Sequence, residues 1–183
     1  FHQNSKSNEL WSLTLETPTT FSPQLLKNHR SKSLDILIQD NKNNIHLINA
    51  AGSIKWSKQL NEPIIGEVQQ IDIYGNNKYQ MAFNTPSHIY VIDINGNHVK
   101  GFPVKLSNKA TSPLTIFDYE NNFNYRFWVS CEDLTTYNYD KEGKKVNAKL
   151  REMIREEIDN YSDKDTFTKK KEGQERSEEK LKQ

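Results

Sequence analysis

The chain repeats itself with a period of about 45 residues. Glycines that each follow an apolar run are 44 and 47 residues apart: Gly52, Gly96 and Gly143. Aromatic residues are spaced alike, at 45 and 46 residues: Trp11, Trp56 and Phe102. Asp72 and Tyr79 recur 46 residues later as Asp118 and Tyr125. Three independent markers with nearly the same spacing indicate a structural repeat, which limits the folds open to the chain.

Each repeat predicts four short β-strands. In the middle repeat we expect them at residues 66–73, 79–84, 88–93 and 99–106. These runs are rich in β-branched and aromatic residues and are broken by Asn, Gly and Pro, which is typical of strands rather than helices. The dipeptide Asn95-Gly96 predicts a type I′ hairpin turn. A period near 45 with four strands per repeat is that of β-propeller blades.

We therefore predict an all-β fold, a partial β-propeller of about three four-stranded antiparallel blades within residues 1–146. The blades are expected at residues 17–60, 61–106 and 107–146. Residues 10–15 match the last strand of a preceding blade, so a stray strand is predicted there. Three blades do not close a ring, so we expect apolar blade faces to be exposed near Trp11 and near Phe127 and Trp128.

Two stretches resemble known propeller repeats. Residues 47–56, Leu-Ile-Asn-Ala-Ala-Gly-Ser-Ile-Lys-Trp, look like the repeat of pyrroloquinoline-quinone-type (quinoprotein-like) β-propellers, within the wider WD40-like repeat superfamily. Residues 93–103, with Asn95-Gly96 and Gly101-Phe102-Pro103, are similar to hairpins of propeller repeats in envelope proteins of Bacteroidetes-like bacteria. The resemblance covers residues 11 to about 146. It implies the fold and a bacterial cell-envelope or periplasmic setting, because the matched residues are turn and packing residues.

Residues 147–183 do not follow the repeat. They hold ten basic and ten acidic residues among 37, and their apolar residues recur at helical spacing: Leu150, Met153, Ile154, Ile158 and Tyr161. We predict a C-terminal helix of about four turns, followed by a disordered tail because the composition beyond residue 162 buries little apolar surface. An appended helix, a junction to another protein and a reading-frame error all remain open origins for this segment.

Composition limits the class of partner. Lys and Arg number 25 against 24 Asp and Glu, so no global basic excess indicates nucleic acid. The single cysteine, Cys131, predicts neither an internal disulfide nor a cysteine metal site. No apolar run approaches the roughly 20 residues of a membrane helix. The chain opens with Phe1, and we interpret it as a piece of a longer protein that supplies further blades.

No residue predicts catalysis, cofactor binding or a metal site. The repeated aromatic residues could form a platform for a quinone, but recurrence in every repeat favours a wedge that packs one blade on the next. The loops at Asp93–Asn97 and Asp140–Gly143 are too short for an EF-hand calcium site and are interpreted as turns. The predicted key residues are structural: Trp11, Gly52, Trp56, Gly96, Phe102 and Gly143.

The sequence therefore predicts a non-catalytic propeller scaffold or protein-interaction module, with no cofactor, in a larger bacterial cell-envelope protein. A protein is the expected partner. The alternatives are a fragment of a quinoprotein dehydrogenase and a carbohydrate-binding propeller, the latter based on Tyr74, Tyr90 and Tyr119. A unique cluster of acid, Asn and Trp around an axial pocket would favour the dehydrogenase.

Overall fold

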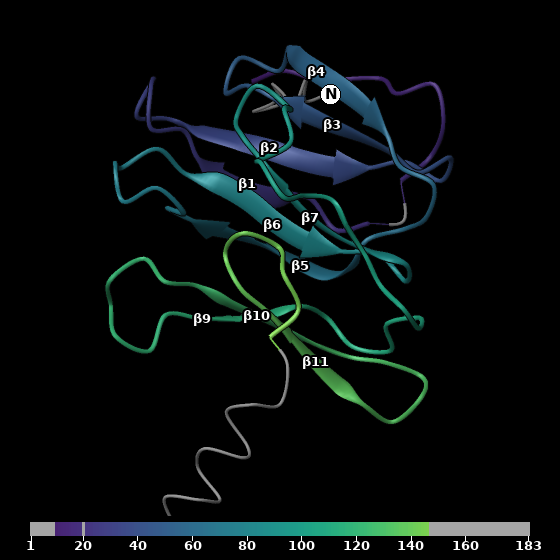
Figure 1. Cartoon of the computed structure of the whole chain (residues 1–183). Helices are drawn as coiled ribbons and strands as arrows, with labels where there is room; N and C mark the ends of the chain where they lie inside the picture. The colour runs from purple at the N-terminus through teal and green to yellow at the C-terminus, as the bar shows by residue number, and fades with distance from the viewer. Residues whose placement is uncertain (1–9, 20, 147–183) are drawn as a thin grey trace, which may run out of the picture. The chain divides into compact units, whose positions relative to one another are not determined.

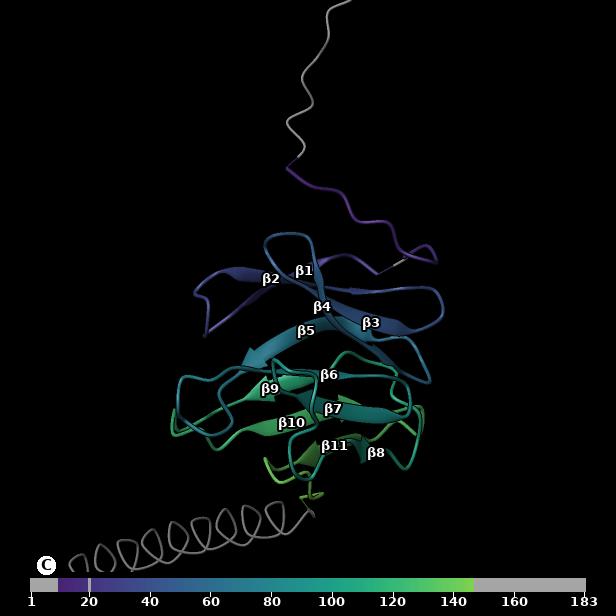
Figure 2. The same cartoon turned by 90° about the horizontal axis from the view of Figure 1, so that it is seen from above.

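The computed structural model describes residues 10–19 and 21–146, which contain eleven β-strands. The strands form three antiparallel sheets that follow one another along the chain and lie face to face (Figures 1 and 2). All of them belong to the compact unit of residues 1–145, and the remaining unit comprises residues 146–183. The described residues include no helix long and apolar enough to cross a membrane.

Each sheet is a meander in which consecutive strands pair. The first holds β1 (Gln24–Lys27), β2 (Leu34–Gln39), β3 (Asn44–Ile48) and β4 (Ile54–Gln59). The second holds β5 (Ile65–Ile71), β6 (Gln80–Asn84), β7 (His88–Ile92) and β8 (Val104–Lys105). The third holds β9 (Thr115–Phe117), β10 (Arg126–Ser130) and β11 (Thr136–Tyr139). The predicted all-β, propeller-like fold class is confirmed.

The third sheet has three strands rather than the predicted four. Its hairpin turns at Gly143, but only the single bridge between Tyr139 and Lys145 continues the pairing. The predicted tail helix and disordered segment at 147–183 lie outside the described residues.

Two predicted strands are corrected. Residues 10–15 form no strand and belong to no sheet of the described structure. The predicted strand 99–106 is cut by a turn in which Phe102 N–H donates to Val99 O at 3.0 Å and Gly101 has φ +91°. Only β8 therefore pairs regularly with β7, and Phe102 is directed into the core, where it is buried.

The outer hairpin turns share one geometry, which is not type I′. Gly96 has φ +84°, but Asn95 does not adopt a positive φ, as a type I′ turn requires. Instead Gly96 N–H bonds Asp93 O at 2.9 Å, and the Asp93 carboxylate accepts the N–H groups of Asn95 and Asn97. Asn49 and Asp140 cap the turns of the other two sheets in the same way. Asp93 and Asp140 thus serve as turn caps, as the sequence predicted, and Asn49 is a third cap of the same kind.

Two apolar cores hold the three sheets together. Leu37 and Leu47 of the first sheet pack in one cluster with Phe83 and Ile92 of the second. The other core joins the second and third sheets, with these buried residues among its members: Ala82, Ile89, Val91, Phe127 and Val129. Every residue of β6 is buried, because its alternating side chains face both cores. The second sheet is therefore the centre of the described structure.

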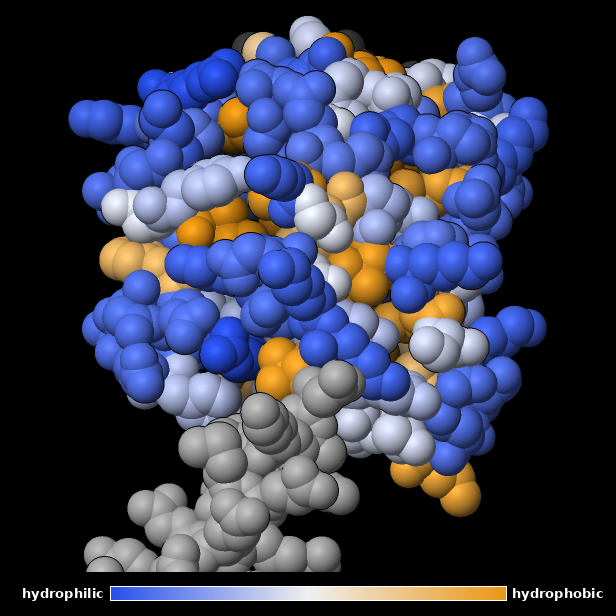
Figure 3. All heavy atoms as spheres, viewed as in Figure 1, coloured by the Kyte–Doolittle hydropathy of each residue, from blue (hydrophilic) through white to orange (hydrophobic). Residues whose placement is uncertain are grey.

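The far side of the third sheet is mostly polar. Phe127 faces the second sheet and is 0% exposed, so the predicted exposed apolar face at Phe127 is wrong. Alternation places Arg126, Ser130 and Asn138 on the other side of the sheet, with half-buried Trp128 among them. The side of the molecule seen in Figure 3, which looks onto the edges of the sheets, is mainly hydrophilic with small hydrophobic patches.

A buried side-chain amide fixes each crossover between sheets. Asn84, at the end of β6, accepts the N–H of Leu114 at 2.8 Å and donates to Ser112 O at 3.1 Å. Gln39, at the end of β2, makes the same two bonds to Ile64 N and Glu62 O, at 2.9 and 3.4 Å. Each amide thus hydrogen-bonds the carbonyl of the residue before a proline and the N–H of the residue after it. Buried backbone groups need such partners, so the amides set where the next sheet begins.

We predict that Asn84→Ala lowers the free energy of unfolding by about 2–3 kcal/mol, because it leaves the buried Leu114 N–H and the partly buried Ser112 carbonyl unpaired. The matched control is Ser130→Ala at the corresponding place in the third sheet. Ser130 Oγ bonds only Thr136 Oγ1, at an exposed position, so the control should cost less than about 1 kcal/mol. Urea denaturation of both variants gives the comparison. Equal losses would show that the amide does not fix the crossover.

Candidate interaction groove

The turns between first and second strands and between third and fourth strands lie at the same end of each sheet, because the sheets are antiparallel meanders. We call this end the turn face. In the second sheet it carries the β5–β6 turn, residues 72–79, and the β7–β8 turn, residues 93–103. In the third sheet it carries the β9–β10 turn, residues 118–125, and the hairpin at Gly143. Side chains from neighbouring sheets meet on this face.

The junction between the first and second sheets is closed at the turn face. The Trp56 indole covers Gly96, where an added Cβ would be 3.2 Å from the ring, and its Nε1 donates to Ile94 O at 2.9 Å. Arg30 reaches across to Asn95 Oδ1 at 3.0 Å. Trp11 contacts the first sheet in the same manner, covering Gly52 and donating to Ala50 O at 3.1 Å. The repeated tryptophan is therefore a packing device.

The junction between the second and third sheets departs from this pattern. Phe102 occupies the repeat position of Trp56, but its ring packs edge-on against Phe127 in the core, with the centroids 5.3 Å apart. The Gly101 backbone contacts the Gly143 hairpin instead, so closely that a Cβ on Gly101 would be 2.1 Å from Glu142 O. Tyr74 occupies the repeat position of Arg30, 44 residues later, but among the described residues its side chain makes no hydrogen bond like that of Arg30. The Tyr125 hydroxyl bridges this junction instead, accepting the Asp72 N–H at 3.3 Å.

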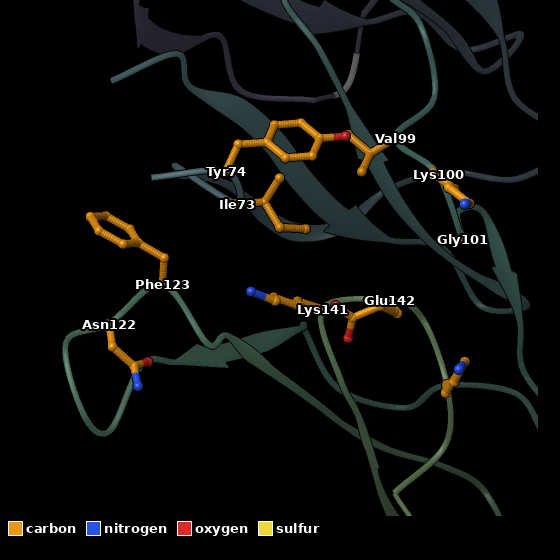
Figure 4. A pocket seen from close by; sticks show the side chains of 10 residues that line it. Ile73, Tyr74, Val99, Lys100, Gly101, Asn122, Phe123, Lys141 and Glu142 are labelled. Atoms are coloured by element: carbon orange, nitrogen blue, oxygen red, sulfur yellow. The ribbon is translucent and has the colours of Figure 1, made fainter. Parts of the chain in front are cut away.

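A groove of about 640 Å³ lies at this second junction (Figure 4). Ile73 and Val99 form its apolar floor, and Tyr74 and Phe123 flank it. The rest of the lining is polar: Lys100, Gly101, Asn122, Lys141, Glu142 and Lys144. The first junction, by contrast, contains a cavity of only about 10 Å³. The groove therefore occurs where the repeat is broken.

The β9–β10 turn holds Phe123 at the groove by local hydrogen bonds. Asp118 accepts the N–H groups of Asn122 at 3.2 Å and Phe123 at 2.8 Å, and Phe123 adopts φ +63°. The ring lies on Gly75, where an added Cβ would be 2.8 Å away. Gly75 itself has φ +61°, so glycine suits this position for two reasons. The aromatic wall is thus set by turns of both sheets.

The lining of the groove carries a net positive charge. Lys100 and Lys144 are exposed and Lys141 is half-buried. The Lys141 side chain extends toward the space between Ile73 and Phe123 (Figure 4). Within the described ranges, none of the three ammonium groups has a carboxylate within 4.0 Å. Lys55 and Asp35, by contrast, form an ion pair 2.8 Å apart within the first sheet.

A second polar cluster, at the opposite end of the sheets, has a structural geometry. Ser87 Oγ contacts both Glu62 Oε2 and, at 2.7 Å, His88 Nδ1. Burial tends to raise the pKa of Glu62, but hydrogen bonds from Ser87 and Thr85 outweigh burial and lower that pKa. The serine hydroxyl then donates to the carboxylate, and His88 Nδ1 donates to the serine. In this arrangement His88 is no base toward Ser87, unlike the histidine of a hydrolase triad.

Asp40 forms a third polar cluster, between β2 and β3. Its carboxylate accepts the backbone N–H groups of Lys42 and Asn44 at 2.9 and 2.8 Å, and the Thr17 hydroxyl at 2.8 Å. Burial would raise the pKa of Asp40, but these bonds, those from Asn44 foremost, hold it far below its ordinary value. In the part of the chain that the structure describes, no three His, Cys, Asp or Glu side chains meet as a metal site would require.

Tyr74 is the one groove wall that the sequence singled out, as a candidate for carbohydrate stacking. Among the six predicted structural residues, Trp11, Gly52, Trp56 and Gly96 lie at closed packing contacts, while Phe102 and Gly143 lie beside the groove. Phe123 and the three lysines were missed, because they lie in turns that differ between repeats. The replacement of tryptophan by phenylalanine at 102 was the available signal. The buried Cys131 has a pKa raised by burial first, then by Asp133 and Glu132.

Comparisons with known proteins support the fold alone. No protein-family model matches the sequence, and no curated protein is similar enough to match. A solved structure described as BBS1N in complex with ARL6DN, soaked with lead, matches with a TM-score of 0.51 and 12% identity. The match covers 73% of this chain and 43% of that chain, so this chain spans less than half of it. BBS1N has a propeller-like fold.

We predict that Asp40→Asn destabilises the protein by about 1–3 kcal/mol at neutral pH, since the amide nitrogen meets donors where the carboxylate accepted them. Because the pKa of Asp40 is lower in the folded state, its carboxylate adds to the free energy of unfolding. This contribution is fully present at pH values above the pKa in the unfolded chain, about 3.9. The contribution is lost as the pH falls toward the pKa of Asp40 in the folded protein. The difference between wild type and variant should therefore shrink below about pH 4. Unfolding curves measured across this range check it, and a constant difference would contradict it.

Proposed function

We propose that this chain is a non-catalytic β-propeller interaction module that holds a protein partner in the groove between the second and third sheets. The observation that carries this proposal is the break in the repeat. A binding site requires residues that are not shared by every blade, whereas packing uses the same residues each time. The groove, with its aromatic walls and lysine rim, occurs at the junction where Phe102 and Tyr74 stand at the repeat positions of Trp56 and Arg30.

The solved neighbour adds a parallel. BBS1N is described in complex with a second protein, ARL6DN. A propeller-like chain that binds protein is therefore a reasonable model for this one, and the partner of BBS1N is not transferred to it. A place in a larger bacterial cell-envelope or periplasmic protein remains a proposal that rests on the resemblance of the hairpins at residues 93–103.

One alternative, carbohydrate binding, has specific support. Tyr74 is 60% exposed and Tyr119 is 70% exposed, and Tyr119 stacks on Phe117 with the ring centroids 5.3 Å apart. Exposed rings of this kind can stack on sugars. Tyr90, in contrast, is only 7% exposed and packs on Phe83, so it is not available for such contacts. The lysines around the groove favour a charged partner over a neutral sugar.

We expect a photoreactive phenylalanine derivative at position 74 to crosslink the full chain to one discrete protein in its native host. The same derivative in place of Lys109, in the crossover between β8 and β9, is the matched control. The adduct at position 74 should be lost when Lys141→Glu is added, because the charge reversal acts inside the groove. Equal adducts at both positions, or an adduct that survives Lys141→Glu, would place the partner elsewhere and overturn the proposal.

We also expect no pyrroloquinoline quinone binding. The residues that resemble quinoprotein repeats are Gly52 and Trp56, which serve turn and packing roles. Reconstitution of the full chain with the quinone and Ca²⁺, followed by equilibrium dialysis and dye reduction, measures this. Stoichiometric binding or dye reduction would support the dehydrogenase alternative.

A further inference from the structure

We infer that the groove binds an extended acidic peptide segment that inserts one aromatic or large apolar side chain between Tyr74 and Phe123. The inference rests on the proposed function and names the chemistry of the partner. It follows from the shape of the apolar floor, the charge of the rim and the arrangement of both around one cavity.

The floor and walls select an apolar anchor. Phe123 is 43% exposed and Tyr74 is more exposed still, although each ring lies beside the buried floor residues Ile73 and Val99. A volume of about 640 Å³ lies within the usual range of ligand pockets, about 300–1,000 Å³. Large apolar side chains with a fixed position are the usual anchors of protein interfaces. The groove therefore has space for an anchor together with the residues on either side of it.

The rim selects negative charge beside that anchor. The lining has three lysines and one glutamate, so three positive charges minus one negative charge leave a formal charge of +2. The lysines come from two separate turns, Lys100 from the β7–β8 turn and Lys141 and Lys144 from the Gly143 hairpin. Gly101 contacts Glu142, so the two turns meet and concentrate positive charge beside the apolar floor. Such an arrangement complements a chain with acidic residues next to one apolar residue.

A nucleic acid fits these observations less well. Non-specific binding to single strands requires a positively charged groove that follows the backbone over several nucleotides. Here the positive lining is confined to one cavity and the formal charge of the whole chain is +1. Lining arginines, which commonly bind phosphate in two-point fashion, are also lacking among the described lining residues. An acidic peptide is the ligand that matches both the local charge and the apolar floor.

The test uses the full chain and a fluorescein-labelled peptide of ten residues, Glu and Asp throughout with one central Phe. Fluorescence anisotropy should show saturable binding that weakens as salt is added. A second peptide has Ala in place of the Phe, and a third has Lys in place of every acid. An unlabelled oligothymidylate of similar length serves as the competing polyanion. Amide shifts in a ¹⁵N-labelled sample locate the binding site.

The protein variants separate charge from anchor. Lys141→Glu should weaken binding of the Phe peptide by about tenfold or more, while the exposed control Lys109→Glu should change it by less than about twofold. Tyr74→Ser, at an exposed position, should remove most of the difference in affinity between the Phe and Ala peptides. Circular dichroism and melting curves comparable with the wild type show that each variant is folded.

Each outcome decides the inference. Tight binding of the Phe peptide, loss with Lys141→Glu and shifts at Tyr74, Phe123 and Lys141 support it. No binding, equal binding of the lysine peptide, or displacement by oligothymidylate at equal affinity would overturn it. A crosslink at position 74 without binding of the acidic peptide would leave the interaction module standing and refute only the chemistry of its ligand.

Discussion

Every blade in this structure depends on burial against a neighbouring sheet. A single meander of three or four strands has two faces, and only contact with another sheet removes its apolar side chains from water. The second sheet does this on both faces, which is why Met81, Ala82 and Phe83 are consecutive and all buried. The structure is therefore stabilised mainly at the junctions between sheets.

Directional polar contacts determine how the sheets meet. Gln39 and Asn84 bond the backbone on either side of the crossover prolines, and their burial makes any loss of these bonds costly. Trp56 adds a third contact by covering Gly96 and bonding Ile94. Where this set is complete the junction is closed. At the next junction the amide is retained, but the tryptophan contact is replaced by the inward turn of Phe102.

That replacement links packing to function. A phenylalanine has no N–H to hold it over the next hairpin, and here it joins Phe127 in the core. Gly101 takes the close backbone contact, and the space on the turn face becomes a groove. The third sheet also lacks an amide at Ser130 and has a polar far side, so it does not repeat the junction that the second sheet offers.

The sequence alone determined the period, the all-β class, the positions of most strands and the glycine turns. Those features are local or periodic, so strand propensity and the spacing of Gly52, Gly96 and Gly143 were enough to predict them. The tertiary structure alone decided the strand breaks, the burial of Phe127 and the groove. Tyr74, Phe123 and Lys141 come from three turns distant in the sequence, and they meet only because two sheets pack face to face. No periodic pattern records which junction will close and which will stay open, since that depends on the direction in which one side chain, Phe102, turns.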